Sequence, residues 1–358
     1  MPRVDEAERK RALAREAAGD RVLVASTQAT TRWLLCGRGR PVDVGSVDYT
    51  VVVRPGDAFV LFADIEAPRV EAEERFSQLG YEHVPYPWHE GPAPAIAKLA
   101  GGSAVVSDVE AEERLALHRR ELAREELVRY RVAGAAAAAA FREAFTLLRP
   151  GLSEQDAAGQ LAYAALARGL QPRVVLVAGE RRQPVFRHPV PTRAPLGAHA
   201  LLALTAEQDG LHVSLTRLVS FGPAPDTLAE LQRAATQVDA AVIAASEPGR
   251  THGELLDVLI EAYRTRGFPD EWRLHHQGGL TGYKGREVFA TPGEPTPLPA
   301  SCAVAWNPSI SGGAKSEDTV LVTETGVDVI TRTEEQPELS TDVGIPRPAI
   351  VELTPPRS

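Results

Sequence analysis

The first third of the chain alternates short apolar runs with charged segments of helical spacing. Two β-rich runs, 49–53 and 58–62, flank the turn Arg54-Pro55-Gly56-Asp57 and predict a hairpin. The same region is expected to form strands at 20–27, 30–40 and 101–108, and helices at 5–18 and 65–80. This alternation predicts an α/β domain.

The pattern then changes. Residues 109–147 are strongly helix-forming, with acidic and basic side chains four positions apart. Pro150-Gly151 ends this helical region, and Ser153 with Asp156 predicts the N-cap of the next helix. The remainder predicts strands at 174–179, 199–222, 302–310 and 318–331, and helices at 227–246 and 252–267.

Length and composition indicate an ordinary globular protein of roughly two domains. The chain has 358 residues, 44% of them hydrophobic and 24% charged, so it can bury a large core. A net charge of −9 argues against nucleic-acid binding, and two cysteines argue against a disulfide framework or a cysteine-based zinc site. No long apolar window suggests a membrane span and the charged N-terminus shows no signal peptide, so we expect a cytoplasmic protein without a membrane partner.

The changes in pattern divide the chain into three expected parts. These are an N-terminal domain at 1–118, a second domain at 119–335, and a tail rich in Pro and Glu at 336–358. The tail is expected either to hang loose or to pack as an extended arm.

Three motifs occur in a fixed order in the second domain. They are Leu-Arg-Pro-Gly-Leu-Ser-Glu at 148–154, Glu-Gln-Asp-Gly-Leu-His-Val-Ser-Leu-Thr-Arg at 207–217, and Ser-Glu-Asp-Thr-Val-Leu-Val-Thr-Glu-Thr-Gly at 316–326. With these motifs the chain resembles the creatinase, aminopeptidase P and methionine aminopeptidase superfamily. The resemblance implies an α+β pita-bread domain preceded by a creatinase-type α/β domain, and it implies a homodimer.

Active metallopeptidases of this superfamily hold two divalent ions with two Asp, one His and two Glu, and this chain departs from that set. The resemblance carries the five positions to Ala203, Ser214, Gly279, Asn307 and Glu317. Only Glu317 keeps a ligand of the expected type, and one carboxylate cannot hold two ions. We therefore expect no catalytic metal and no other cofactor.

His188, in the segment 186–192, matches the catalytic histidine of creatinase by position. A histidine with a pKa near neutrality can move protons without a metal. Without ions, Glu317 could act as a base or could orient His188. The alternatives are a structural histidine bonded to a loop carbonyl, and a glutamate that is a relic of the lost metal site.

A Gly-rich segment, 275–283, replaces the loop that carries the metal-binding histidine in the superfamily. It contains His275, His276, Gln277 and Tyr283. Because adjacent residues of a strand point to opposite faces, we expect at most one of the two histidines to face the cleft. The alternative is a Gly-rich connector with a surface histidine.

Arg286 and Glu287 stand where the aminopeptidases have a His-Glu pair. An arginine offers a bidentate fork to a substrate carboxylate, whereas the alternative is an exposed Arg–Glu pair of little energetic weight. Ser214 and Asn307 could hydrogen-bond a polar substrate where the ions bind in active relatives. Arg217, in the well-matched second motif, is expected to be structural.

These observations predict a metal-independent, creatinase-like enzyme that acts on a C–N bond of a small amino-acid-like substrate, by hydrolysis or elimination. His188, Glu317 and His276 are the expected catalytic residues. The expected substrate-binding residues are His275, Gln277, Tyr283, Arg286, Glu287, Ser214 and Asn307. The alternative is a non-catalytic pseudo-peptidase that binds a peptide or protein partner, and a conventional metallo-aminopeptidase would require the ligand positions to be misaligned.

Overall fold

The computed structural model describes residues 3–333 and 336–354, and the chain forms two compact units. Unit 1 comprises Met1–Glu126 with two short inserted segments, Asp209–Leu211 and Gly282–Lys284, and unit 2 comprises the rest. These units are defined by contacts within the fold. The expected division at residue 118 follows a change in sequence pattern and stays a prediction.

Unit 1 is built around a five-stranded mixed sheet with the strand order β4-β3-β2-β1-β5. The predicted hairpin is confirmed, because β2 pairs antiparallel with β3 and Thr50 lies opposite Leu61. Apolar side chains on the strands form the core of the sheet. The elements are α1 (Arg3–Ala18), β1 (Val22–Ala25), α2 (Gln28–Leu34), β2 (Thr50–Arg54), β3 (Asp57–Ala63), β4 (Glu82–Tyr86), α4 (Ala93–Ala100), β5 (Val105–Ser107) and α5 (Glu112–Arg120).

One expectation for unit 1 is wrong, and another holds only in part. The expected strand at 30–40 is instead the helix α2, capped by Thr27, whose side chain accepts a hydrogen bond from the amide of Thr30. Because α2 is buried on nearly all sides, it lacks the alternating polar face that identifies a helix. The expected helix at 65–80 is a run of short helices of different pitch between Asp64 and Leu79 that includes α3 (Ala67–Arg69), and Arg75 in a left-handed conformation interrupts it.

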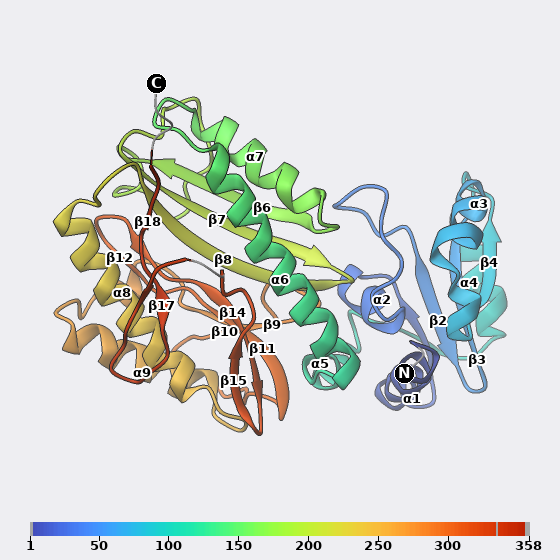
Figure 1. The fold of residues 1–358 in the computed structure, drawn as a ribbon. Helices are drawn as coiled ribbons and strands as arrows, with labels where there is room; N and C mark the ends of the chain where they lie inside the picture. The colour runs from blue at the N-terminus through green and yellow to red at the C-terminus, as the bar shows by residue number, and fades with distance from the viewer. Residues whose placement is uncertain (1–2, 334–335, 355–358) are drawn as a thin grey trace. The chain divides into compact units, whose positions relative to one another are not determined.

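Unit 2 contains two larger sheets, each accompanied by a pair of helices (Figure 1). The first sheet has the order β18-β8-β7-β6, and the second has the order β10-β9-β11-β14-β15. The elements of the first half are α6 (Arg124–Leu147), α7 (Glu154–Leu166), β6 (Gln171–Gly179), β7 (His199–Gln208) and β8 (Leu211–Ser220). Those of the second half are α8 (Asp226–Ala245), α9 (His252–Thr265), β9 (Gly278–Thr281), β10 (Val288–Phe289), β11 (Ser301–Trp306), β12 (Ser309–Ile310), β13 (Ala314–Lys315), β14 (Asp318–Thr323) and β15 (Gly326–Val329).

The helices α8 and α9 pack on the second sheet through one large apolar cluster. Val242 and Leu259 from the helices meet Val304 and Trp306 from β11 in this cluster. The indole of Trp306 also donates a hydrogen bond to Ser246 Oγ at 3.0 Å, which satisfies its buried polar atom. Trp306 is therefore a core residue, and this packing fixes the strand that leads to Asn307.

The described part of the tail, 336–354, packs on unit 2 as an extended arm. The hairpin of β16 (Glu338–Leu339) and β17 (Arg347–Pro348) precedes β18 (Val351–Glu352), which pairs parallel with β8. The guanidinium of Arg347 is buried and pairs with both Asp239 and Asp318. The arm thus contributes a strand and a buried cation to the domain.

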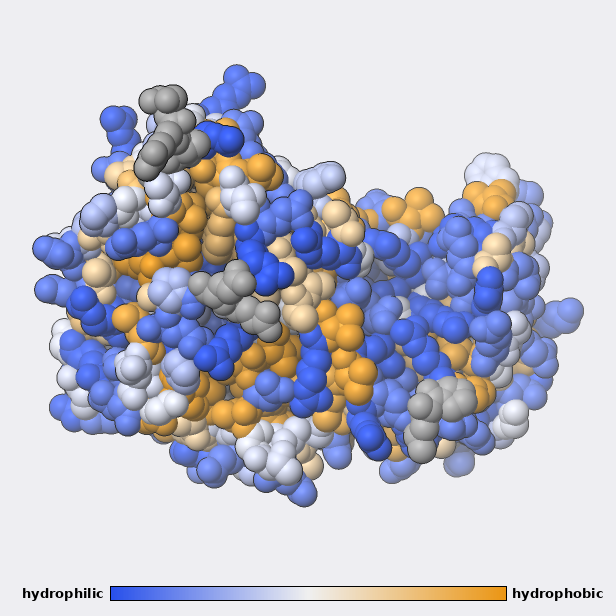
Figure 2. Space-filling model, viewed as in Figure 1, coloured by the Kyte–Doolittle hydropathy of each residue, from blue (hydrophilic) through white to orange (hydrophobic). Residues whose placement is uncertain are grey.

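The visible surface is mostly hydrophilic, with apolar patches between the polar side chains (Figure 2). Among the exposed apolar residues are Val128 and Val132 on α6, and Tyr163 and Leu166 on α7. None of the helices in the described residues is long and apolar enough to cross a membrane.

Candidate functional site

Unit 2 contains a pocket of about 200 Å³ between residues of its two sheets. Part of its lining comes from β6 and β7, and the rest comes from β10, β13 and loops of unit 2. The lining residues are Val174, Leu176, His188, Ala203, Leu204, Thr205, His276, Gly285, Arg286, Phe289, Asn307, Lys315 and Glu317. Five expected site residues, His188, His276, Arg286, Asn307 and Glu317, thus lie around one cavity.

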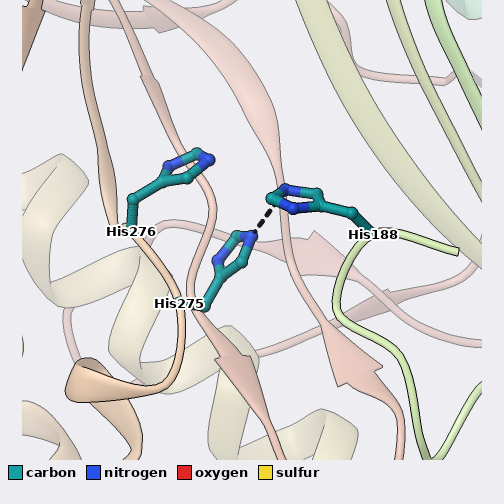
Figure 3. Close-up of side chains that lie close together, drawn as sticks. All are labelled: His188, His275 and His276. Atoms are coloured by element: carbon teal, nitrogen blue, oxygen red, sulfur yellow. Dashed lines mark hydrogen bonds between the residues drawn. The ribbon is translucent and has the colours of Figure 1, made fainter.

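Three imidazoles cluster at this pocket (Figure 3). His188 Nε2 lies 3.0 Å from His275 Nε2, within hydrogen-bond distance. The rings of His275 and His276 stack with their centroids 4.4 Å apart. Only one of the two adjacent histidines lines the pocket, as expected, although their rings stack because both residues precede β9 rather than lying within it. His276 lines the pocket, while His275 is buried.

Polar contacts fix the loops that carry these histidines. Arg187 beside His188 donates to Ser309 Oγ at 2.9 Å and pairs with Glu271 at 2.5 Å. The amide of Gln277 donates to the carbonyl of His275 at 2.6 Å and accepts from Tyr263 Oη at 3.0 Å. Gln277 was expected to bind substrate, but its side chain supports the loop of His275 and is absent from the pocket lining.

The environment of the imidazoles favours their neutral forms. Burial lowers the pKa of His276 to about 4, assisted by the positive charge of Arg286. Burial and the ammonium of Lys315 also lower the pKa of His188, opposed by Glu317, and they hold the pKa of His275 far below its usual range. All three rings are therefore neutral at pH 7, and His188 can accept a proton there.

Glu317 is surrounded by partners that stabilise its charged form. Its carboxylate accepts from Thr216 Oγ1 at 2.6 Å, and it pairs with Lys315 at 3.2 Å and Arg286 at 3.4 Å. Burial acts to raise the pKa of Glu317, but the two cations and the hydroxyl outweigh it and hold the pKa below its ordinary value. Glu317 is therefore ionised at neutral pH.

Lys315 is a pocket residue that the sequence analysis missed. It is 5% exposed, and its ammonium pairs with Glu317. The spacing of Lys315 and Glu317 could have indicated this, because residues two positions apart in an extended segment point to the same face. A lysine two positions before the retained glutamate could have been placed beside it.

The expected ligand positions do not form a dinuclear metal site. Ala203 supplies no ligand, and Ser214 Oγ is hydrogen-bonded to Thr205 Oγ1 at 2.9 Å. Gly279 has a φ of +143°, and a Cβ atom at this position would lie 2.2 Å from the carbonyl oxygen of Val288. The backbone therefore leaves no space for a histidine side chain at residue 279, and the residues present do not fit two divalent ions.

The three imidazoles are a separate candidate for a single ion. Within residues 3–333 and 336–354 they form the one cluster of at least three ligating side chains, with nitrogen atoms within 4.8 Å of one another. Neutral histidines suit an ion such as Zn²⁺. The positive charges of Lys315, Arg286 and Arg187 already lower the pKa of these rings, and they would also repel a metal cation bound there.

Other expected binding residues lie away from the pocket lining. Tyr283 belongs to unit 1, where its hydroxyl donates to Glu126 at 2.6 Å and accepts from Lys10 at 3.1 Å. Glu287 is buried, and its backbone amide donates to the carbonyl of Leu280 at 2.8 Å. Arg217 is structural as expected, since it is buried and paired with Asp318 at 2.7 Å.

The sequence profile described as metallopeptidase family M24 matches residues 128–324. The chain is 27% identical over 252 residues to the uncharacterized peptidase YqhT of Bacillus subtilis, covering 65% of this chain and 69% of that protein. It is 33% identical over 145 residues to the agropine synthesis cyclase of Rhizobium rhizogenes, covering 38% and 36%. The structure of dipeptidase PepE from Mycobacterium ulcerans superposes with a TM-score of 0.75 at 20% identity, covering 98% of this chain and 99% of that one. The chain therefore belongs to metallopeptidase family M24 and has its pita-bread fold, preceded by an N-terminal domain.

Proposed function

We propose that this chain is a metal-independent, creatinase-like enzyme that acts on a C–N bond of a small amino-acid-like substrate by histidine acid/base catalysis. The observation that carries the proposal is the contact between His188 and His275, two neutral imidazoles beside a carboxylate that two cations already bind. A proton acceptor, a fixed carboxylate and two fixed cations therefore surround one small cavity.

His188 is the proton carrier in this proposal. In hydrolysis it removes a proton from the attacking water, and in elimination it removes a proton from a substrate carbon. The protonated ring then returns that proton to the leaving nitrogen as the C–N bond breaks, so the enzyme ends in its starting state. His275 contacts His188 through Nε2 and orients its ring.

Lys315 and Arg286 supply the positive charge that metal ions supply in an active metallopeptidase. Both line the pocket and both contact Glu317, which keeps them in place. A fixed cation stabilises negative charge that develops on a carbonyl oxygen or a departing group in the transition state. Glu317 and His276 complete the proposed catalytic group, Glu317 by holding the cations and His276 by stacking on His275.

The names of two relatives support an enzymatic function and include a reaction other than peptide hydrolysis. YqhT is named as a peptidase, and the Rhizobium relative is named as a synthesis cyclase. A ring-closing activity among the relatives supports chemistry other than peptide hydrolysis for this chain. A homodimer remains part of the proposal and follows from the family resemblance alone.

The loss of the ligand set also favours a second candidate, a non-catalytic pseudo-peptidase that binds a peptide or protein. Ala203 and Gly279 provide no metal ligand, as a protein without peptidase activity would tolerate. The enzyme is preferred because side chains that can move a proton or stabilise developing negative charge are retained around one cavity. These side chains are His188, Lys315 and Arg286.

The test is turnover in the absence of metal. The purified chain is analysed for bound metal, treated with a chelator, and incubated with a panel of dipeptides, N-acyl amino acids, lactams and guanidino acids, with products followed by mass spectrometry. We expect conversion of at least one compound to survive chelation and to fall about 100-fold or more in His188→Ala. His89→Ala is the matched control, since His89 is an exposed histidine of unit 1.

Two results would contradict the proposal. Activity that requires an added divalent ion, or an ion that co-purifies at the three histidines, would return the chain to metal-dependent chemistry. Conversion that is unchanged in His188→Ala would remove histidine from its assigned role. If metal-free protein converts none of the compounds, the pseudo-peptidase is the better description.

A further inference from the structure

The charges that line the pocket are unequal. Arg286 and Lys315 are cations, and Glu317 is the one acidic side chain among the described residues of the lining. Two cations and one carboxylate leave an excess of one positive charge, because the neighbouring imidazoles are neutral at pH 7. A ligand that carries a net negative charge therefore matches the pocket.

The carboxylate of Glu317 is poorly placed to receive a substrate ammonium group. One of its oxygens accepts from Thr216 and lies 3.2 Å from the ammonium of Lys315, and the other lies 3.4 Å from Arg286. An incoming ammonium would compete with two fixed cations for this carboxylate and would lie close to both. Like charges at such distances repel, most strongly where water is excluded.

Two buried polar atoms of the lining indicate which hydrogen-bonding groups a ligand would carry in place of an ammonium group. Asn307 is 2% exposed, and its Oδ1 has no hydrogen-bond partner among the described residues. The Nε of Arg286 is likewise buried without a partner there. An amide N–H of a ligand satisfies the first atom, which is an acceptor, and a carboxylate satisfies the second, which is a donor.

The rest of the lining limits the size and polarity of the ligand. Val174, Leu176 and Phe289 form an apolar part of the lining that suits an acyl group or a ring. The volume of about 200 Å³ lies below the roughly 300–1,000 Å³ that is usual for sites of drug-sized ligands. A small molecule with one carboxylate, one amide and a short apolar part meets these conditions.

We propose that the substrate is a small carboxylate whose nitrogen is blocked as an amide, such as an N-acyl amino acid or a lactam, rather than a zwitterion with a free ammonium group. This inference rests on the proposed function, since it takes the same pocket as the substrate site. It distinguishes the chain from an enzyme that recognises the free amino end of a peptide.

Two matched pairs of ligands test this inference on the full, metal-free chain by isothermal titration calorimetry. N-acetylglycine is compared with glycylglycine, which adds an ammonium group to the acyl carbon, and pyroglutamate is compared with proline, whose ring nitrogen is charged, so that each pair differs mainly by one positive charge. We expect the blocked member to bind about tenfold or more tightly in both pairs. Equal or tighter binding of the zwitterions, or no binding of any of the four, would overturn the inference.

Variants connect the preference to its source. Lys315→Met is expected to reduce the preference for blocked carboxylates, Lys315→Arg to keep it, and Lys98→Met, which alters an exposed lysine of α4, to leave it unchanged. Circular dichroism checks that each variant folds. If Lys315→Met does not fold, the two ligand pairs on the unmodified chain and on Lys315→Arg still decide the question.

The same titrations on His188→Ala separate this inference from the proposed function. A preference for blocked carboxylates that persists in His188→Ala, combined with an unmodified chain that converts none of them, upholds the substrate class and contradicts the catalytic proposal. Metal-free turnover that depends on His188, combined with a preference for zwitterions, upholds the catalytic proposal and overturns the substrate class.

Discussion

Glu317 and Asp318 are neighbours in the chain, yet their carboxylates lie in different surroundings. Glu317 lines the pocket and pairs with Lys315 and Arg286. Asp318 points away into the interior, where it pairs with Arg217 and Arg347, each at 2.7 Å, and accepts from Thr331 Oγ1 at 2.6 Å. Both carboxylates pair with two cations, but Glu317 lines the pocket, whereas Asp318 is buried in the interior.

The difference separates charges that hold the fold from charges that can meet a ligand. Both oxygens of Asp318 accept from buried donors, so this carboxylate is satisfied within the protein. Its neighbour Asp239, which shares Arg347, keeps a buried Oδ1 without a partner among the described residues. Around Glu317, Arg286 Nε and Asn307 Oδ1 remain buried without partners among the described residues. Unsatisfied buried groups are costly, and these two belong to residues that line a cavity, where a ligand could pair with them.

The largest expected effect on stability comes from neutralising one of these two carboxylates, and the two variants are compared with each other. Asp318→Asn leaves Arg217 and Arg347 facing a neutral amide in the interior, and we expect a loss of about 3–5 kcal/mol in the free energy of unfolding. Glu317→Gln acts beside a cavity that water can enter, so we expect a loss of about 1 kcal/mol. Urea unfolding of both variants measures the two losses, and equal losses would contradict the distinction.

The fold was readable from the sequence because its motifs are local and ordered. The segments 148–154, 207–217 and 316–326 each identify a particular strand or helix start, and together they fix the family. The capped helix after Ser153 was predictable for a similar reason, since a capping box is a short-range pattern. The helix α2 was not, because burial on nearly all sides removes its periodicity.

The site was readable only in part. Sequence position alone identified His188 and Glu317 as candidate catalytic residues. The contact between His188 and His275 could not be predicted, because it joins two loops that are 87 residues apart. Lys315 was missed because the ligand set inherited from the family directed attention to carboxylates and histidines. The buried hydroxyl of Tyr283 pairs with Lys10 and Glu126 instead of facing the pocket, which is a matter of tertiary packing.

The buried network also predicts that the arm at the end of the chain stabilises unit 2. Arg347→Met removes the partner that Asp239 and Asp318 share, and we expect a loss of about 3 kcal/mol in the free energy of unfolding. Arg332→Met is the matched control. Its side chain is 58% exposed in a pair with Glu338, so we expect a loss of at most about 1 kcal/mol. Chemical denaturation checks both values, and a small loss in Arg347→Met would show that the arm contributes little.

A substitution at Gly279 tests whether the backbone itself excludes a side chain at the position where the superfamily has its metal-binding histidine. Gly279→Ala places a Cβ atom 2.2 Å from the carbonyl oxygen of Val288 at a φ of +143°, and we expect a loss of about 2–3 kcal/mol in stability. In Gly151→Ala the new Cβ has no neighbour within 4 Å and φ is not positive, so stability should change by less than about 1 kcal/mol. Thermal unfolding compares the two variants. A fully stable Gly279→Ala would reopen the question of a histidine ligand at this position.

The smallest expected effect is a pH dependence that arises at the pocket. His276 faces Arg286, His188, Lys315 and Glu317. Burial, Arg286, His188 and Lys315 lower its pKa against the opposing charge of Glu317, from the ordinary 6.5 to about 4 in the folded chain. The unfolded chain therefore binds a proton first as the pH falls, so the contribution of His276 to stability is complete above pH 6.5 and is lost between about pH 6.5 and 4. Because the ring is partly exposed to solvent, we expect this loss to be about 1 kcal/mol. His276→Gln should flatten the stability profile over this range, whereas His89→Gln, at an exposed histidine of unit 1, should leave the profile around the pocket unchanged. A profile that is identical in His276→Gln would show that the ring is not held neutral by the surrounding cations, and the basis for a neutral imidazole cluster at this pocket would be lost.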